Sequence, residues 1–176
     1  GRNLGNPPFA TRESLPSIRD RELEEACKVI GITDLRKMGL RDKTVEFEPY
    51  EHIDGMIKSL IDDTNPSLII SFYPGYAVHP DHEATADAVI RTVERMPKEE
   101  RPRLTLVAFS NDATEALGEP DIQNDITDFK ELKIKAFEAH ASQTGPFLKQ
   151  LASPEIDGKQ HSFLTVEPYW TYHFKS

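Results

Sequence analysis

The stretch from Ser67 to His82 reads SLIISFYPGYAVHPDH, and it decides the fold. Its first six residues are mostly apolar, which is typical of a short strand that is covered on both faces. A turn containing Gly and Tyr follows, and a helical spacing of apolar residues runs from about Asp81 to Met96. In open α/β sheets, ligands bind where a strand ends and the chain crosses to a helix. We therefore expect functional residues between Tyr73 and His82.

The segment His79-Pro80-Asp81-His82 places two imidazoles and a carboxylate at that crossover. Pro80 suits the first helical position because it has no N–H, and it keeps His79 extended. His82 follows three residues later, so both rings can point into one cleft. The positive end of the helix dipole favours a neutral His82, the form that binds metal. Asp81 could orient a ring or stabilise an imidazolium, and both roles remain open beside the simpler interpretation of two surface histidines.

The rest of the chain alternates between helical and strand patterns. Helical spacing predicts further helices over residues 17–30, 52–62 and 128–142. Strands are expected near 34–38, over 104–109 and, as an edge strand, within 162–174, whereas 110–124 reads as irregular. This order predicts an α/β fold with a Rossmann-like, mostly parallel sheet and helices on both faces.

Composition limits the class of protein. The 176 residues fit a single domain over 1–176, and a net charge of −9 argues against nucleic acid as a partner. No apolar run is long enough to cross a membrane, so the cytoplasm is the expected location. The single cysteine, Cys27, lies on an apolar helical stripe and is predicted to be a buried structural thiol.

Other polar residues could serve function or structure. Arg19 could bind substrate from a cleft, or form an exposed ion pair with Glu22, and spacing favours the ion pair. His140 lies on an apolar helical stripe, where a core histidine and a residue behind the site are equally consistent with the pattern. The remaining histidines are expected at the surface: His52, His161 and His173.

Three segments together resemble the LmbE-like, or PIG-L, family of zinc-dependent N-acetylglucosamine deacetylases: residues 18–31, 75–82 and 135–143. The opening residues 1–12 are similar to the branch in bacillithiol biosynthesis, which deacetylates N-acetylglucosaminyl malate. The resemblance implies a metal-dependent N-deacetylase that acts on a small acetylated amino-sugar conjugate.

The resemblance also implies roles for individual residues. His82 matches the family's zinc-binding histidine, and His79 matches the histidine that stabilises the oxyanion and protonates the leaving amine. Asp81 matches the carboxylate that supports this histidine. Arg19 matches an arginine that contacts substrate, and Tyr76 lies one place from a tyrosine that some members use at the reacting carbonyl. His140, in the third segment, completes the expected substrate-binding set.

One family motif is absent from the sequence. The first His-Pro-Asp-Asp motif supplies the other His and Asp ligands and the general base, and no such string occurs here. We expect it, with the first strand of the sheet, upstream of Gly1, so that the deacetylase domain is incomplete at its N-terminus. Zn²⁺ is the expected cofactor, and Fe²⁺ suits the same ligands.

Two other functions remain in view. An α/β module could bind a sugar or nucleotide in the same crevice without hydrolysis. A serine hydrolase ranks lower, because the sequence has no Gly-x-Ser-x-Gly elbow. Self-association into a homo-oligomer is left open.

Overall fold

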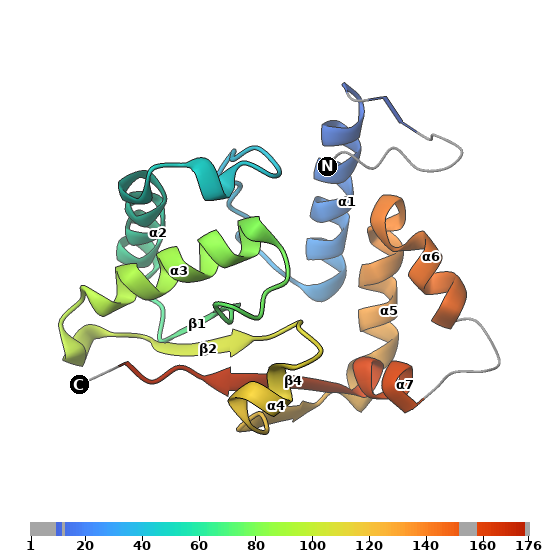
Figure 1. Cartoon of the computed structure of the whole chain (residues 1–176). Helices are drawn as coiled ribbons and strands as arrows, with labels where there is room; N and C mark the ends of the chain where they lie inside the picture. The colour runs from blue at the N-terminus through green and yellow to red at the C-terminus, as the bar shows by residue number, and fades with distance from the viewer. Residues whose placement is uncertain (1–9, 12, 152–157, 175–176) are drawn as a thin grey trace. The chain divides into compact units, whose positions relative to one another are not determined.

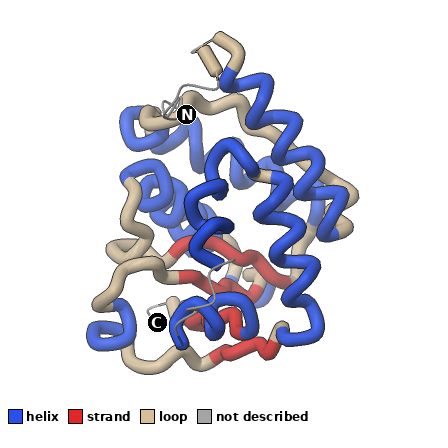
Figure 2. Tube along the Cα trace, turned by 90° about the vertical axis from the view of Figure 1, so that its right-hand side faces the viewer, coloured by secondary structure: helices blue, strands red, loops and turns tan. Residues whose placement is uncertain are grey.

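The computed structural model describes residues 10–11, 13–151 and 158–174. Helix is the commonest element along the trace, and the strands lie together in one sheet (Figure 2). The chain divides into two compact units, which we call unit 1 (residues 1–37 and 124–167) and unit 2 (residues 38–123 and 168–176).

The sheet belongs largely to unit 2. Strand β1 (Leu68–Phe72) pairs in parallel with β2 (Arg103–Val107), and β2 pairs antiparallel with β4 (Val166–Thr171). The strand order is β1-β2-β4-β3, where β3 is Ile122–Asp125. The α/β class predicted from the sequence is confirmed, and β1 and β2 form the expected parallel pair.

Two helices pack with this sheet in unit 2. Helix α2 (Tyr50–Thr64) packs against α3 (Pro80–Glu94), and α3 also contacts β1 (Figure 1). Shorter elements complete the unit: η1 (Val45–Phe47), η2 (Lys98–Glu100) and α4 (Ala113–Leu117). The predicted apolar stripes meet in one core, formed by Val45, Ile53, Ile57, Ile61, Ala88, Val89, Ile90, Val93, Leu104 and Leu106.

A buried carboxylate ties α2 to α3. Asp54 is 5% exposed, and its oxygens accept hydrogen bonds from Arg91 Nη2 at 2.7 Å and Arg95 Nη1 at 2.9 Å. The hydrogen bond to Asp54 raises the pKa of Arg91 above its ordinary value. The buried charge is therefore fully paired, as burial requires.

Unit 1 is helical. Helix α1 (Leu15–Ile30) packs beside α5 (Lys130–Ala139), which η3 (Thr127–Phe129) precedes and α6 (Ala141–Leu151) and α7 (Gly158–Thr165) follow (Figure 1). The rings of Phe137, Phe147 and Phe163 form a cluster with centroids 5.3 to 5.6 Å apart. Cys27 is buried, as predicted.

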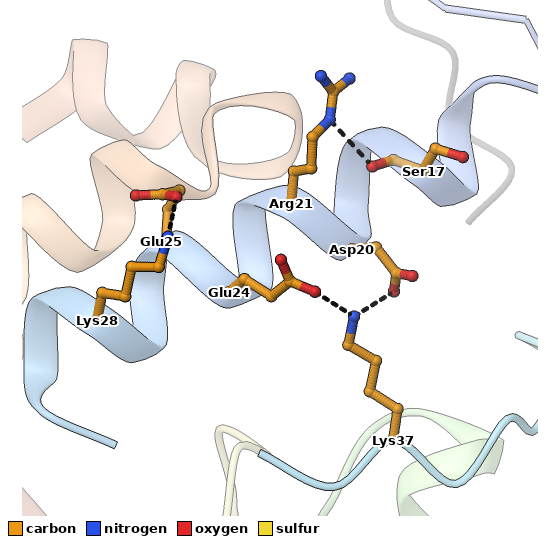
Figure 3. A network of polar contacts seen from close by, with 7 residues as sticks. All are labelled: Ser17, Asp20, Arg21, Glu24, Glu25, Lys28 and Lys37. Carbon is orange, nitrogen blue, oxygen red and sulfur yellow. Dashed lines mark hydrogen bonds and ion pairs between the residues drawn. The ribbon is translucent and has the colours of Figure 1, made fainter. Parts of the chain in front are cut away.

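The segment after α1 corrects one expectation. Gly31 ends the helix in the left-handed conformation at φ 80°, as a C-terminal glycine does. The side chain of Lys37 then forms ion pairs with α1, with Nζ 2.8 Å from Glu24 Oε1 and 3.4 Å from Asp20 Oδ1 (Figure 3). The strand predicted near 34–38 was wrong, because this charged segment pairs with acidic side chains rather than with another strand.

The C-terminal half differs from expectation in three places. Residues 110–124, expected to be irregular, contain α4 and the start of β3. The helix predicted over 128–142 ends at Ala139, and α6 restarts at Ala141, where Thr144 Oγ1 donates to the carbonyl of Phe137. The expected edge strand within 162–174 is α7 followed by β4, and β4 lies between β2 and β3 rather than at an edge.

Candidate functional site

The two histidines of the crossover lie in unit 2, where the sequence placed them. His79 is the N-cap of α3, with extended backbone at φ −122° and ψ 135°, and Pro80 is the first helical residue. The ring nitrogen Nδ1 of His79 accepts a hydrogen bond from the backbone N–H of Asp81 at 3.1 Å. This contact satisfies one of the free amides at the start of the helix.

His82 is held on two sides. Its Nδ1 lies 3.3 Å from the carbonyl oxygen of Ala77, and its ring stacks on Phe72 with centroids 4.2 Å apart and planes 12° apart. The rings of His79 and His82 are 5.2 Å apart between centroids. The structure therefore brings the two predicted histidines together.

In their neutral forms, the two rings are assigned opposite tautomers by these hydrogen bonds. A backbone N–H can only donate, so Nδ1 of His79 carries the lone pair and Nε2 carries the proton. A carbonyl can only accept, so Nδ1 of His82 carries the proton and Nε2 keeps the lone pair. His79 thus offers a hydrogen-bond donor, and His82 offers a nitrogen that can bind a metal ion.

Asp81 contacts a distant part of unit 2. Its Oδ2 accepts a hydrogen bond from the N–H of Lys43 at 2.6 Å, and its Oδ1 accepts one from the N–H of Val45 at 3.1 Å. These bonds join the start of α3 to the segment that enters η1. Sequence spacing gave no sign of this contact, because the partners are backbone groups 36 and 38 residues away.

Tyr76 lies in the turn before the histidines. Its carbonyl oxygen accepts hydrogen bonds from the N–H groups of Phe109 and Ser110 at 2.8 and 3.1 Å, and its ring is 5.8 Å from that of Tyr73. The bonds from Phe109 and Ser110 join the turn to the segment that follows β2. Burial raises the pKa of the neighbouring Tyr73 above its ordinary value.

Two residues near His82 were not predicted from the sequence as site residues. Phe109 is 54% exposed, and its ring centroid is 6.4 Å from that of His82. Glu83 accepts hydrogen bonds from two amides of the turn before α3. The sequence did carry one signal for Phe109. It ends the apolar run 104–109, and the strand parallel to that run, β1, is followed by the segment with the two histidines.

Arg19 and Glu22 lie on α1 in unit 1. Glu22 accepts hydrogen bonds from the N–H and Oγ of Ser142 at 2.8 and 2.5 Å, which joins α1 to the start of α6. Arg19 is half-buried, and its Nε is a buried atom with no hydrogen-bond partner among the residues that the structure describes. Buried polar atoms normally have a partner, so this nitrogen is available to a ligand.

His140 lies at the end of α5, also in unit 1. It lines a cavity of about 370 Å³ with Phe137, Lys133 and Glu167, and the last two form an ion pair at 3.1 Å. Within the described ranges, Nδ1 of His140 is buried and has no hydrogen-bond partner. The ring is thus partly inward, as its place on the apolar stripe predicted.

His82 has the chemistry of a metal ligand, because the neutral ring that donates from Nδ1 keeps a lone pair on Nε2. The described part of the chain contains no group of three or more His, Cys, Asp or Glu residues placed to hold a metal ion. A search of the same residues finds no helix long and apolar enough to span a membrane.

Comparison with known proteins gives consistent matches. Residues 2–93 match the model of the PIG-L family, described as GlcNAc-PI de-N-acetylase. A Bacillus anthracis protein named probable N-acetyl-alpha-D-glucosaminyl L-malate deacetylase 2 is 46% identical over 177 residues, covering 99% of this chain and 78% of that protein. The protein of the same name from Bacillus subtilis (strain 168) is 45% identical over 174 residues, covering 98% and 79%.

A solved structure shares the fold. The N,N'-diacetylchitobiose deacetylase of Pyrococcus horikoshii, complexed with its inhibitor MPG, matches with a TM-score of 0.62 at 23% identity. The match covers 91% of this chain, which spans 65% of the length of that protein. At this identity the likeness supports the α/β fold alone.

Proposed function

Because this chain belongs to the PIG-L family of de-N-acetylases, we propose that it removes the acetyl group from N-acetylglucosaminyl L-malate. The substrate is the one in the names of the relatives, which are 45 to 46% identical over nearly the whole chain. The observation that carries the chemistry is the pair of neighbouring histidines with opposite tautomers.

Amide hydrolysis needs a stabilised oxyanion and a proton for the leaving amine. The proton on Nε2 of His79 makes this ring the hydrogen-bond donor, and an imidazole can pass such a proton to the amine. A well-placed oxyanion donor is typically worth about 100- to 1000-fold in rate. Asp81 assists by fixing the start of α3, where His79 is the N-cap.

We assign His82 as one ligand of a divalent metal ion, with zinc preferred and iron(II) suited to the same ligand types. A bound ion of this kind would lower the pKa of a water molecule and polarise the amide carbonyl. The support for His82 is its lone pair on Nε2, which the hydrogen bond from Nδ1 to Ala77 leaves free.

Arg19, Tyr76 and His140 are proposed to contact the substrate. Arg19 Nε and His140 Nδ1 are buried without partners among the described residues, which is the condition a ligand group would relieve. Tyr76 is fixed in its turn by the bonds from Phe109 and Ser110. We also propose that the protein acts in the cytoplasm and can form a homo-oligomer.

Acetate release tests the substrate directly. We expect the purified protein, supplied with Zn²⁺, to release acetate from N-acetylglucosaminyl L-malate with a higher kcat/KM than from N-acetylglucosamine. Release from a different acetylated sugar, with none from the malate conjugate, would show that the substrate is wrong while the deacetylase class stands.

Two variants separate the roles of the histidines. His79→Ala is expected to keep its metal content and lose about 100-fold or more in kcat, since an oxyanion donor is removed. His82→Ala is expected to lose metal as well as activity. An unchanged kcat in the first, or an unchanged metal content in the second, would remove the corresponding role.

A second function is a sugar-binding α/β module without hydrolysis. It is favoured by one observation, which is that no group of three metal-ligand residues lies together in the described ranges. Binding of N-acetylglucosaminyl L-malate by calorimetry, with neither bound metal nor acetate release, would select this module over the deacetylase.

A further inference from the structure

We propose that Glu83 is a positioning residue that sets the tautomer of His82 through the turn formed by residues 75–77. Its importance for catalysis rests on the proposed function of His82. The tautomer can be measured in the protein without metal or substrate.

Glu83 closes the turn that lies before α3. Its Oε2 accepts a hydrogen bond from the N–H of Gly75 at 2.5 Å, and its Oε1 accepts one from the N–H of Ala77 at 2.8 Å. Ala77 is 1% exposed, so its amide depends on this partner rather than on water. One carboxylate therefore fixes two points of the turn.

The same turn supplies the acceptor for His82. The carbonyl oxygen of Ala77 accepts the hydrogen bond from Nδ1 of His82 at 3.3 Å. The carboxylate of Glu83 accepts a hydrogen bond from the N–H of Ala77, and Nδ1 of His82 donates one to the carbonyl of the same residue. The position of this carbonyl thus depends on the carboxylate of Glu83.

The turn needs such support because it is strained. Val78, which follows Ala77, has φ 68° although it is β-branched and 70% exposed. Left-handed backbone costs a residue with a Cβ about 1–2 kcal/mol relative to right-handed backbone. A residue stays in this conformation only where its surroundings determine it, and the two bonds of Glu83 are contacts that do so.

Stacking on Phe72 cannot choose the tautomer alone. The planes of Phe72 and His82 are 12° apart, and turning the imidazole by half a revolution within its stack would keep this contact. That turn would move Nδ1 away from Ala77. The carbonyl of Ala77 is therefore the group that selects which nitrogen keeps the proton.

The expected effect follows from the strength of one hydrogen bond. A typical net hydrogen bond corresponds to about a fivefold change in an equilibrium constant. Loss of the Glu83 carboxylate should therefore shift the ratio of the two His82 tautomers by about fivefold toward the form with the proton on Nε2. The metal affinity through Nε2 should fall only in proportion to the competent tautomer that is lost, which is less than fivefold.

Long-range ¹H–¹⁵N spectra of histidine-labelled full chain test this role at pH 8, where free histidine is neutral. The His82 signals are assigned by their loss in His82→Asn. We expect a single tautomer with Nδ1–H in the wild type, a mixture in Glu83→Ala, and an intermediate ratio in Glu83→Gln, which keeps one acceptor oxygen. Glu99→Gln removes the same charge from an exposed residue of η2 and should match the wild type.

Each outcome decides the role of Glu83. A wild-type His82 tautomer in folded Glu83→Ala, or an equal shift in Glu99→Gln, would overturn it. If Glu83→Ala does not fold, the isosteric Glu83→Gln decides by the same spectrum. Failure of the wild type to bind Zn²⁺ would instead remove the proposed function of His82 and leave the tautomer result standing.

Discussion

The two units treat their candidate nitrogens in opposite ways. In unit 2, Nδ1 of His79 and Nδ1 of His82 each have a backbone partner. In unit 1, Arg19 Nε and His140 Nδ1 are buried and have none among the described residues. Groups that act on a reaction gain from fixed geometry, whereas groups that bind a ligand need free donors or acceptors. The fixed nitrogens support our proposal that His79 and His82 carry the chemistry.

The two units also differ in how their side chains are packed. The core cluster of unit 2 joins two helices, a 3₁₀ turn and a strand around buried aliphatic side chains. Among the described residues, unit 1 buries Leu15, Ala26, Cys27 and Leu164, and it adds half-buried phenylalanines and polar links such as that between Glu22 and Ser142. The larger buried cluster belongs to the unit that contains His79 and His82.

A core truncation in each unit gives the largest expected effect. Leu106 in β2 and Leu15 in α1 are both 0% exposed. Leu106→Ala should lower the free energy of unfolding by about 3 kcal/mol, because the surrounding core cannot collapse onto the cavity. Leu15→Ala, at the first residue of a helix, should cost about 2 kcal/mol. Urea unfolding measures both, and a larger loss in Leu15→Ala would reverse the ranking of the units.

Removal of the buried carboxylate comes next. Asp54→Ala leaves Arg91 without its partner, and this guanidinium is only 27% exposed. Because Arg91 and the more exposed Arg95 can reach water, we expect a loss of about 2 kcal/mol rather than the full cost of a buried charge. Asp62→Ala, which breaks the exposed pair with Lys58, is the matched control and should cost under about 0.5 kcal/mol. Equal losses in urea titrations would show that Asp54 is not a structural anchor of unit 2.

Relief of strain in the turn before His79 should act in the opposite direction. Val78→Gly removes the Cβ from a residue at φ 68° and should raise the free energy of unfolding by about 1 kcal/mol, since the side chain is largely exposed. Thermal unfolding followed by circular dichroism measures this gain. A lower melting temperature would mean that the side chain of Val78 supports the turn.

Acid sensitivity gives the smallest effect, with one carboxylate in each unit. Hydrogen bonds from the Thr171 hydroxyl and amide lower the pKa of Asp121, and those from Thr127 lower the pKa of Asp125. A lowered pKa in the folded state gives stability that is present above the ordinary value of 3.8 and is lost as the pH falls through the folded value. Asp121→Asn should therefore flatten the fall in the urea midpoint below pH 4, relative to wild type. An unchanged slope in this variant would show that the contact with Thr171 adds no acid-labile stability.

The local patterns of the chain predicted its continuous elements well. The apolar run at Ser67 to Phe72 and the proline before Asp81 placed β1 and the start of α3, because burial and φ restriction act within a few residues. The resemblance to the PIG-L family was confirmed on these same residues. The neighbouring positions of His79 and His82 followed from helical spacing alone.

Long-range partners could not be predicted in this way. Asp81 bonds to the backbone of Lys43 and Val45, and β4 inserts beside β2, through contacts that no local periodicity encodes. The strand predicted near 34–38 was wrong because Lys37 pairs with the acidic side chains of Asp20 and Glu24 on α1. The role that we propose for Glu83 depends on the conformation of the turn at residues 75–77, which could not be predicted from the sequence.

The most direct test of the account is the protonation of the two site histidines in the unmodified protein. Long-range ¹H–¹⁵N spectra at pH 8 should show the proton of His79 on Nε2 and the proton of His82 on Nδ1. This result would give one ring a donor for the oxyanion and the other a lone pair for the metal. The same tautomer in both rings, or the reverse assignment, would contradict the division of roles between them.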